Sequence, residues 1–141
     1  MKAKTYYAFV FLLLALCFWS LHAETNTLEN KNLKTYREYS KEAVIASEAE
    51  FTLLYFHASW CPTCHFLEED ILNNLKKMPE NLTIFKVDFD KAEELKISYD
   101  VTVQTSMVLL DKNGVLIKKW LGSRSMQDIL EQVKSATNSN D

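Results

Sequence analysis

The sequence predicts an α/β domain whose mixed central sheet has about four to five strands and carries helices on both faces. An apolar, aromatic-rich run, Phe51–His57, precedes a long amphipathic segment and a second strand-like run, Leu82–Val87. Two further strand-like runs near the C-terminus flank an Asn-Gly turn. The chain has 141 residues, of which 48% are apolar and 25% charged, a balance that excludes a low-complexity protein and leaves room for one domain.

The N-terminal segment 1–23 has the layout of an export signal. Lys2 and Lys4 precede an uncharged apolar stretch, Tyr6–Trp19, and Leu21-His22-Ala23 offers a cleavage site. The stretch is shorter than the ~20 residues that cross a bilayer comfortably. We therefore expect a cleaved signal peptide, with a retained membrane anchor as the alternative.

Lipidation at Cys17 is disfavoured, because Leu16 stands where a small residue is needed. Each of these alternatives exports the domain to the periplasm or another extracytoplasmic compartment. Loss of 1–23 would lower the formal net charge from −3 to −5. An acidic domain without a basic stripe is not expected to bind nucleic acid. Beyond 1–23 we expect a flexible leader at 24–32, a domain at 33–136 that acts as a monomer, and a frayed tail at 137–141.

The first half of the domain alternates helix and strand. Apolar residues at steps of three and four predict a helix over Leu33–Ala49, with its first residues extended. Phe51–His57 suits a strand buried on both faces. A helix then runs from Cys61 to Met78, because Pro62 fits a first helical turn and Pro79 ends the segment. Its expected buried stripe is Phe66, Leu67, Ile71, Leu72 and Leu75.

The second half adds a short helix and a hairpin. Leu82–Val87 is a strand expected to run parallel to Phe51–His57, and Lys91–Ile97 is a short helix. Ser106–Leu110 and Val115–Leu121 form the hairpin. Ser125 caps a last helix, whose core-facing residues are Met126, Ile129, Leu130 and Val133.

Cys61 and Cys64 are too close in sequence to be an efficient structural staple. Closing four residues stabilises a fold by roughly 2 kcal/mol, against over ~4 for a loop of about 60 or more. Cys61 opens a helix after a buried strand, so the first-turn N–H groups and the helix dipole favour its thiolate. The pair is thus suited to redox exchange. The Cys61 thiolate would attack a substrate disulfide, and Cys64 would resolve the mixed disulfide.

Phe56-His57-Ala58-Ser59-Trp60-Cys61-Pro62-Thr63-Cys64 resembles the active-site strand and turn of thioredoxin-fold proteins. The resemblance continues through Lys86–Asp90, Tyr99–Val101, Lys112–Gly114 and Gly122, and covers roughly Leu33 to Ala136. It implies a thioredoxin fold, with Cys61 as nucleophile and Cys64 as resolving thiol. Trp60 would form an apolar platform and Lys86 a nearby cation. The residues expected to line the site are Trp60, Pro62, Thr63, His65, Lys86, Gln104 and Thr105.

Two departures from the family's pattern affect this site. Tyr55 stands where thioredoxin carries a buried Asp, so a proton acceptor for Cys64 is missing and water, Lys86 or His65 would have to assist. Thr105 stands where the family has a cis-proline. A cis bond before a non-proline residue costs ~2.5–4 kcal/mol, so the loop is either trans or strained. Space opened beside the sulfurs would permit adventitious metal or cluster binding.

Two metal-based alternatives use the same residues. Cys61-Pro62-Thr63-Cys64-His65 matches the c-type haem attachment pattern, with His65 and Met107 or Met126 as axial ligands. A zinc site would use Cys61, Cys64, His57 and His65. Both are weaker than the dithiol interpretation, and we expect no resident metal or cofactor.

We therefore predict an exported protein-disulfide oxidoreductase that favours reduction. Its expected partners are protein thiol or disulfide substrates and a membrane-bound or soluble redox partner. A non-catalytic thioredoxin-fold binding or chaperone module is the alternative.

Overall fold

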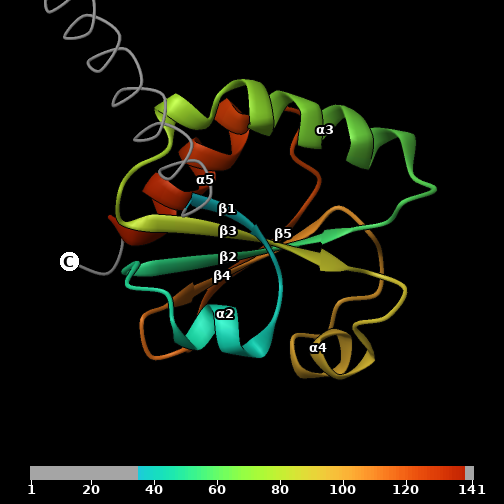
Figure 1. Ribbon diagram of the computed structural model, residues 1–141, viewed down its shortest axis with the longest axis horizontal. Coiled ribbons are helices and arrows are strands. Elements are labelled where there is room, and N and C mark those ends of the chain that lie inside the picture. Colours follow the sequence, from blue (N-terminus) through green and yellow to red (C-terminus); the bar gives the residue numbers. More distant parts are fainter. Residues whose placement is uncertain (1–34, 139–141) are drawn as a thin grey trace, which may run out of the picture. The chain divides into compact units, whose positions relative to one another are not determined.

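The computed structural model describes residues 35–138, which fold around a five-stranded sheet of order β1-β3-β2-β4-β5 (Figure 1). In chain order the elements are β1 (Tyr36–Glu38), α2 (Lys41–Ile45), β2 (Phe51–His57), α3 (Pro62–Asn73), a 3-10 turn (Leu75–Lys77), β3 (Leu82–Asp88), α4 (Glu93–Ser98), β4 (Ser106–Asp111), β5 (Leu116–Leu121) and α5 (Met126–Thr137). The predicted signal peptide 1–23, the leader 24–32 and residues 139–141 of the tail lie outside the described residues.

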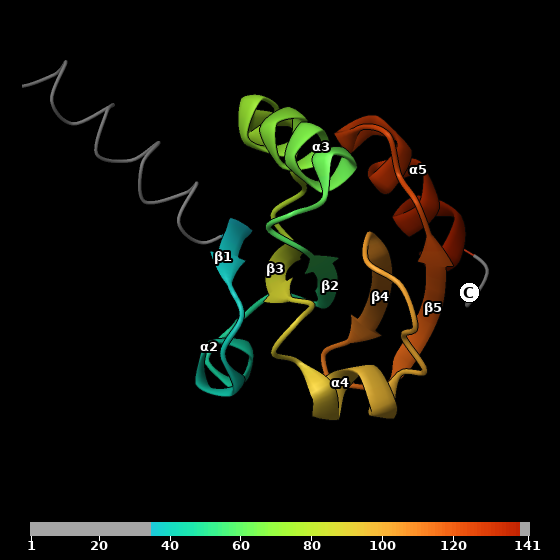
Figure 2. The same ribbon diagram turned by 90° about the vertical axis from the view of Figure 1, so that its right-hand side faces the viewer.

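The sheet is mixed and covered on both faces, which confirms the predicted fold class. β1, β3 and β2 are parallel, while β4 is antiparallel to β2 and β5 to β4. Helices α3 and α5 cover one face, and α2 and α4 cover the other (Figure 2). Among residues 35–138, no helix has both the length and the apolar character needed to cross a membrane.

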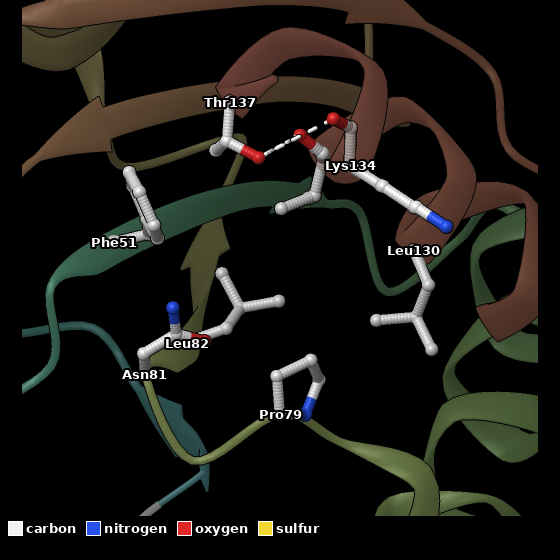
Figure 3. Close-up of a pocket in the computed structure, with 8 residues that line it drawn as sticks. Phe51, Pro79, Asn81, Leu82, Leu130, Lys134 and Thr137 are labelled. Carbon is white, nitrogen blue, oxygen red and sulfur yellow. Dashed lines mark hydrogen bonds between the residues drawn. The ribbon is translucent and has the colours of Figure 1, made fainter. Parts of the chain in front are cut away.

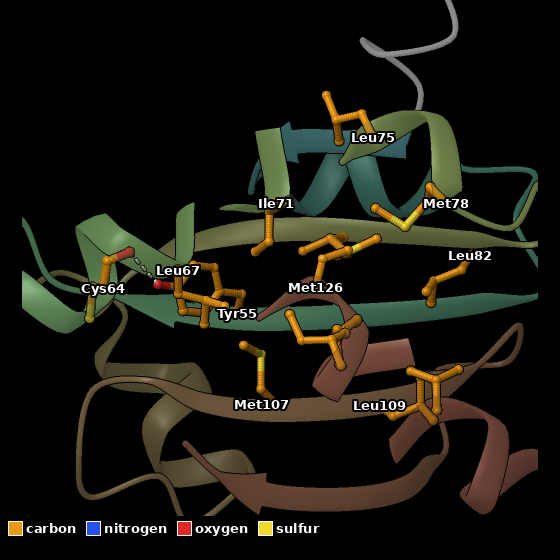
Figure 4. Packing of buried hydrophobic residues seen from close by; sticks show 14 of the residues in the cluster. Tyr55, Cys64, Leu67, Ile71, Leu75, Met78, Leu82, Met107, Leu109 and Met126 are labelled. Atoms are coloured by element: carbon orange, nitrogen blue, oxygen red, sulfur yellow. Dashed lines mark hydrogen bonds between the residues drawn. The ribbon is translucent and has the colours of Figure 1, made fainter. Parts of the chain in front are cut away.

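β2 is the central strand and is buried on both faces, as its sequence predicts. Leu53 and Tyr55 belong to the core under α3 and α5, which also holds Met107 and Met126 (Figure 4). Leu54 and Phe56 alternate to the opposite face and pack under α2 and α4. Each such side chain contributes roughly 1.5–3 kcal/mol on burial, so β2 is a rigid support for the residues that follow it.

The predicted helix over Leu33–Ala49 is shorter than expected. Tyr36–Glu38 is extended, as anticipated for the first residues of the segment, and forms β1, with Tyr36 opposite Ile84 of β3, whereas α2 covers only Lys41–Ile45. The helix α2 starts only after Ser40, whose side chain accepts a hydrogen bond from the Ala43 N–H. Pairing with the open edge of β3 therefore outweighs the helical spacing of the aromatic residues.

The buried face of α3 also differs from the prediction. Phe66 and Leu72 are 71% and 49% exposed, while Leu67 and Ile71 are buried. Cys64 completes the inner stripe, because it precedes Leu67 by one helical turn and is itself fully buried. The α-helix ends at Asn73 and a 3-10 turn carries the chain to Lys77.

The C-terminal hairpin and helix follow the sequence signals. Gly114 adopts φ +78°, and the Asp111 carboxylate accepts hydrogen bonds from the N–H groups of Asn113 and Val115, each at 2.8 Å. Val115 lies in this turn, so β5 begins one residue later than predicted. Ser125 caps α5 by accepting a hydrogen bond from the Asp128 N–H.

Candidate functional site

The two cysteines lie at the start of α3, immediately beyond the carboxyl end of β2. Cys61 is the N-cap residue, with extended backbone angles (φ −94°, ψ 111°) and its N–H bonded to the Ala58 carbonyl at 3.1 Å. Cys64 lies one turn into the helix. Both are free thiols; Cys61 is 3% exposed and Cys64 fully buried. The outer sulfur is therefore the one that a substrate can reach first.

Cys61 Sγ is surrounded by hydrogen-bond donors. The Cys64 N–H lies 3.3 Å from it and the Thr63 hydroxyl 3.0 Å. Burial opposes ionisation, but hydrogen bonds from the Cys64 thiol, Thr63, the Cys64 N–H and Thr105 together lower the pKa of Cys61 to about 7. A large fraction of this thiol is consequently thiolate at neutral pH.

Cys64 has the opposite character. Burial is the main cause that raises the pKa of its thiol, and the neighbouring Cys61 adds to the effect. The inner sulfur thus holds its proton under conditions in which the outer sulfur has lost it. This division between an ionised outer thiol and a protonated inner thiol is what sequential disulfide exchange requires.

Thr105 replaces the expected proline without a cis bond, since no peptide bond among residues 35–138 is cis. It adopts φ +63°, a left-handed conformation that is uncommon for a β-branched residue and costs on the order of 1 kcal/mol. Two backbone hydrogen bonds hold it there, from its N–H to the Phe56 carbonyl and from the Gly122 N–H to its own carbonyl. Its hydroxyl lies 3.3 Å from Cys64 Sγ.

Tyr55 anchors the helix start to the central strand. Its hydroxyl donates to the Cys64 carbonyl at 2.9 Å, and both residues are buried (Figure 4). Burial raises the pKa of Tyr55, so the phenol stays protonated. Tyr55 therefore gives the site a fixed hydrogen-bond donor where the family has a titratable acid.

The other residues predicted to line the site fall into two groups. Trp60 is 59% exposed, and its Nε1–H donates to Asp90 at 2.9 Å, which fixes the indole beside the cysteines. Pro62 and His65 are exposed on the first turn of α3, and Gln104 is half-buried in the turn before Thr105. Lys86 contacts Glu38 and Glu68 and neither cysteine.

Lys86 pairs with carboxylates and not with sulfur. Its Nζ lies 2.7 Å from Glu38 and 2.8 Å from Glu68. Burial alone would lower the pKa of Lys86, but the hydrogen bonds to these two carboxylates raise it. Lys86 is therefore not placed to assist Cys64, contrary to the expectation from the sequence. Its partners Glu38 and Glu68 were not predicted as site residues. The sequence indicated Glu68 only through its position one helical turn after Cys64.

Glu68 also approaches two histidines. One potential ligand atom from each of His57, His65 and Glu68 lies within 4.8 Å of the others. Within the described part of the chain, this is the metal-ligand cluster that the fold assembles, and it contains neither cysteine. The zinc set considered as a weaker alternative, Cys61, Cys64, His57 and His65, is therefore not the one that the structure groups.

A small surface pocket lies at the opposite end of β2 and takes no part in this site (Figure 3). It is lined by Phe51, Pro79, Asn81, Leu82, Leu130, Val133, Lys134 and Thr137.

A sheet covered on both faces, with a dithiol at the helix start beyond its central strand, defines the class of thiol–disulfide oxidoreductases. The model of the family described as Thioredoxin matches residues 32–135, and the chain therefore belongs to the thioredoxin family. Proteins of this family exchange disulfides with protein thiols, so the predicted enzyme class and substrate class are confirmed.

Individual relatives agree with the family assignment. Thioredoxin-1 of Drosophila melanogaster is 29% identical over 82 residues, 58% of this chain and 76% of that protein. Mitochondrial thioredoxin of Mus musculus is 32% identical over 91 residues, 64% of this chain and 53% of that protein. The crystal structure of Trxlp from Edwardsiella tarda EIB202 matches with a TM-score of 0.57 at 27% identity, covering 70% of this chain and 97% of that one.

The haem and binding-module alternatives are not favoured. Met107 and Met126, which the haem alternative would use as an axial ligand, are packed in the core under α3 and α5 (Figure 4).

Proposed function

We propose that this thioredoxin-family protein is an exported reductase of protein disulfides, with Cys61 as nucleophile and Cys64 as resolving thiol. The observation that carries the proposal is the contrast between the two thiols. The pKa of Cys61 is lowered to about 7, while burial raises that of Cys64.

The reaction proceeds through two exchanges. Cys61 thiolate attacks one sulfur of a substrate disulfide, the substrate S–S bond breaks, and its other sulfur leaves as a thiolate. Cys64 then gives up its proton and attacks Cys61 Sγ, which releases the second substrate sulfur. Two electrons have passed from the dithiol to the substrate, and the protein is left with a Cys61–Cys64 disulfide.

The environment of Cys64 bears on the second step. The phenol of Tyr55 stays protonated, and Lys86 is engaged with Glu38 and Glu68. The substrate thiolate released in the first step is therefore the group that accepts the proton of Cys64. The Thr105 hydroxyl, 3.3 Å from Cys64 Sγ, can stabilise the thiolate as it forms.

Turnover requires a second redox protein. Each cycle oxidises the cysteine pair, so a membrane-bound or soluble dithiol partner must return two electrons to it outside the cytoplasm. The basic, apolar segment 1–23 supports the export proposed here, and a monomer suffices because both cysteines come from one chain.

Insulin reduction measured with the protein and with Cys61→Ser tests the nucleophile. We expect the variant to lose turnover, and equal activity would remove the enzymatic role of Cys61.

Cys64→Ser should instead accumulate a mixed disulfide through Cys61, visible by mass spectrometry. Equilibration with glutathione gives the reduction potential, and a value near −120 mV, typical of a strong oxidant, would contradict the reductase.

Export is tested separately. Cell fractionation of the full chain and of a variant lacking residues 2–23 should place only the former outside the cytoplasm, and N-terminal sequencing then distinguishes cleavage from retention.

A further inference from the structure

His57 has a buried ring nitrogen that makes no hydrogen bond within the described residues. The residue is only 7% exposed. Among the buried side-chain nitrogen and oxygen atoms of residues 35–138, its Nε2 is the one without a hydrogen-bond partner. Glu68 Oε2 lies 3.2 Å away, yet the two atoms are not aligned for a hydrogen bond. Buried polar atoms are rarely left in this state, so the nitrogen needs an explanation.

The atoms around it form a potential ligand set. His57, His65 and Glu68 each place one ligand atom within 4.8 Å of the others. Ligands about 2.1 Å from a shared tetrahedral ion are separated by roughly 3.4 Å, close to the 3.2 Å between His57 and Glu68. The His65 ligand atom lies within 4.8 Å of the other two, so a small shift of this exposed side chain is enough to bring all three to a shared ion.

Neighbouring groups already orient these side chains. Glu68 Oε1 accepts hydrogen bonds from the Tyr36 hydroxyl at 2.9 Å and from Lys86 at 2.8 Å, which leaves Oε2 facing His57. His65 Nε2 lies 2.6 Å from the Ser59 carbonyl, so Nε2 carries the proton and Nδ1 keeps its lone pair. Such outer contacts are characteristic of metal-ligating carboxylates and histidines.

The local charge also suits a dication. Glu38 and Glu68 outnumber Lys86 by one negative charge. Burial lowers the pKa of His57, which keeps its imidazole neutral and available as a ligand at neutral pH. A bound dication would turn the net −1 of this cluster into +1.

We propose that His57, His65 and Glu68 form a binding site for a divalent transition-metal ion such as Zn²⁺. Two imidazoles and one carboxylate favour zinc and its transition-metal neighbours over calcium or magnesium, which take oxygen ligands. Three protein ligands leave a fourth position for water or an incoming group. The site is separate from the dithiol, which contributes no ligand.

Zinc binding to a thiol-free full chain, C17S/C61S/C64S, tests the site without competition from sulfur. Isothermal titration calorimetry should show one equivalent of Zn²⁺ bound. Adding His65→Ala, at an exposed position, or Glu68→Gln, which keeps the size of the side chain, should weaken binding at least tenfold. Glu69→Gln, at the exposed neighbouring position on α3, is the matched control and should bind as the parent does.

Thermal unfolding gives a second readout. Zn²⁺ should raise the midpoint of the parent and of Glu69→Gln, and raise it less in His65→Ala. Absence of saturable binding to the folded thiol-free chain would overturn the proposal, and so would equal affinity in the parent, His65→Ala and Glu68→Gln. None of these outcomes depends on disulfide exchange, so the proposed reductase activity stands or fails independently.

Discussion

The hydroxyl of Thr105 lies 3.3 Å from the sulfur of Cys64, at the position where the family has a proline. The replacement changes two things at once. It removes a rigid ring from the loop opposite the cysteines, and it adds a hydrogen-bonding group that acts on both thiols. Thr105 is held with a left-handed backbone by its bonds to Phe56 and Gly122, and from there its hydroxyl reaches Cys64 Sγ.

Thr105→Val should reduce thiol reactivity while leaving the backbone in place. Valine has nearly the same shape and the same β-branch, but it cannot donate a hydrogen bond. We expect the pKa of Cys61 to rise modestly above about 7, because the Thr105 hydroxyl is the weakest of the hydrogen-bonding groups that lower it, and insulin reduction at pH 7 to fall about twofold. Thr105→Ser keeps the hydroxyl and serves as the control. Equal rates in both variants would contradict a role for the hydroxyl.

The two cysteines should titrate separately. Because the pKa of Cys61 is about 7, its alkylation by iodoacetamide should rise with pH and reach half its maximum near pH 7, below the ~8.5 of free cysteine. Cys64 should react only at higher pH. Peptide mapping by mass spectrometry after timed alkylation of the reduced protein assigns each rate. Thr63→Val, which removes the hydroxyl 3.0 Å from Cys61 Sγ, should move the Cys61 midpoint upward, whereas Thr63→Ser should not.

The elements that support the site could be predicted from the sequence because their signals are local. Phe51–His57 is an apolar run long enough for a central strand, and the structure keeps both of its predicted ends. The Asn-Gly turn and Ser125 are equally local, since each acts through the backbone N–H groups of residues a few positions away. The position of the dithiol could be predicted from the strand before it and the helix after it alone.

The cluster around Glu68 could not be predicted in the same way. Tyr36, His57 and Lys86 reach Glu68 from three different strands, and only the pairing of β1, β3 and β2 brings them together. The residues of β1 were expected to be extended, but their pairing with β3 was not predicted, because three residues carry no strand pattern of their own. The left-handed backbone of Thr105 depends on distant partners too, so a sequence could show that proline was absent but not what the loop does instead.

Glu68→Gln should destabilise the fold in a pH-dependent way. Burial opposes ionisation, but hydrogen bonds from Lys86 and Tyr36 lower the pKa of Glu68 below its ordinary value. The stability that the carboxylate contributes is therefore fully present above its unfolded pKa of 4.5 and is lost as pH falls through the lower, folded pKa. We expect a loss of about 1–3 kcal/mol at pH 7 by urea denaturation, shrinking below about pH 4. A loss independent of pH would contradict this account, and Glu69→Gln, on the exposed face, should change stability by less than ~0.5 kcal/mol.

Tyr55→Phe separates the anchoring role of Tyr55 from any part in proton transfer. The variant keeps the buried ring and removes the hydroxyl that donates to the Cys64 carbonyl at 2.9 Å. We expect stability to fall by about 0.5–1.5 kcal/mol, measured by urea denaturation, because one buried hydrogen bond is lost. Tyr39→Phe, at a partly exposed position, should change stability by less than ~0.5 kcal/mol. Since burial keeps the phenol protonated, the pH profile of Cys61 alkylation and the rate of insulin reduction should match the wild type. A shifted pH profile in a stably folded Tyr55→Phe would instead show that Tyr55 takes part in proton transfer. Tyr55, and not the substrate thiolate, would then be the acceptor for the Cys64 proton.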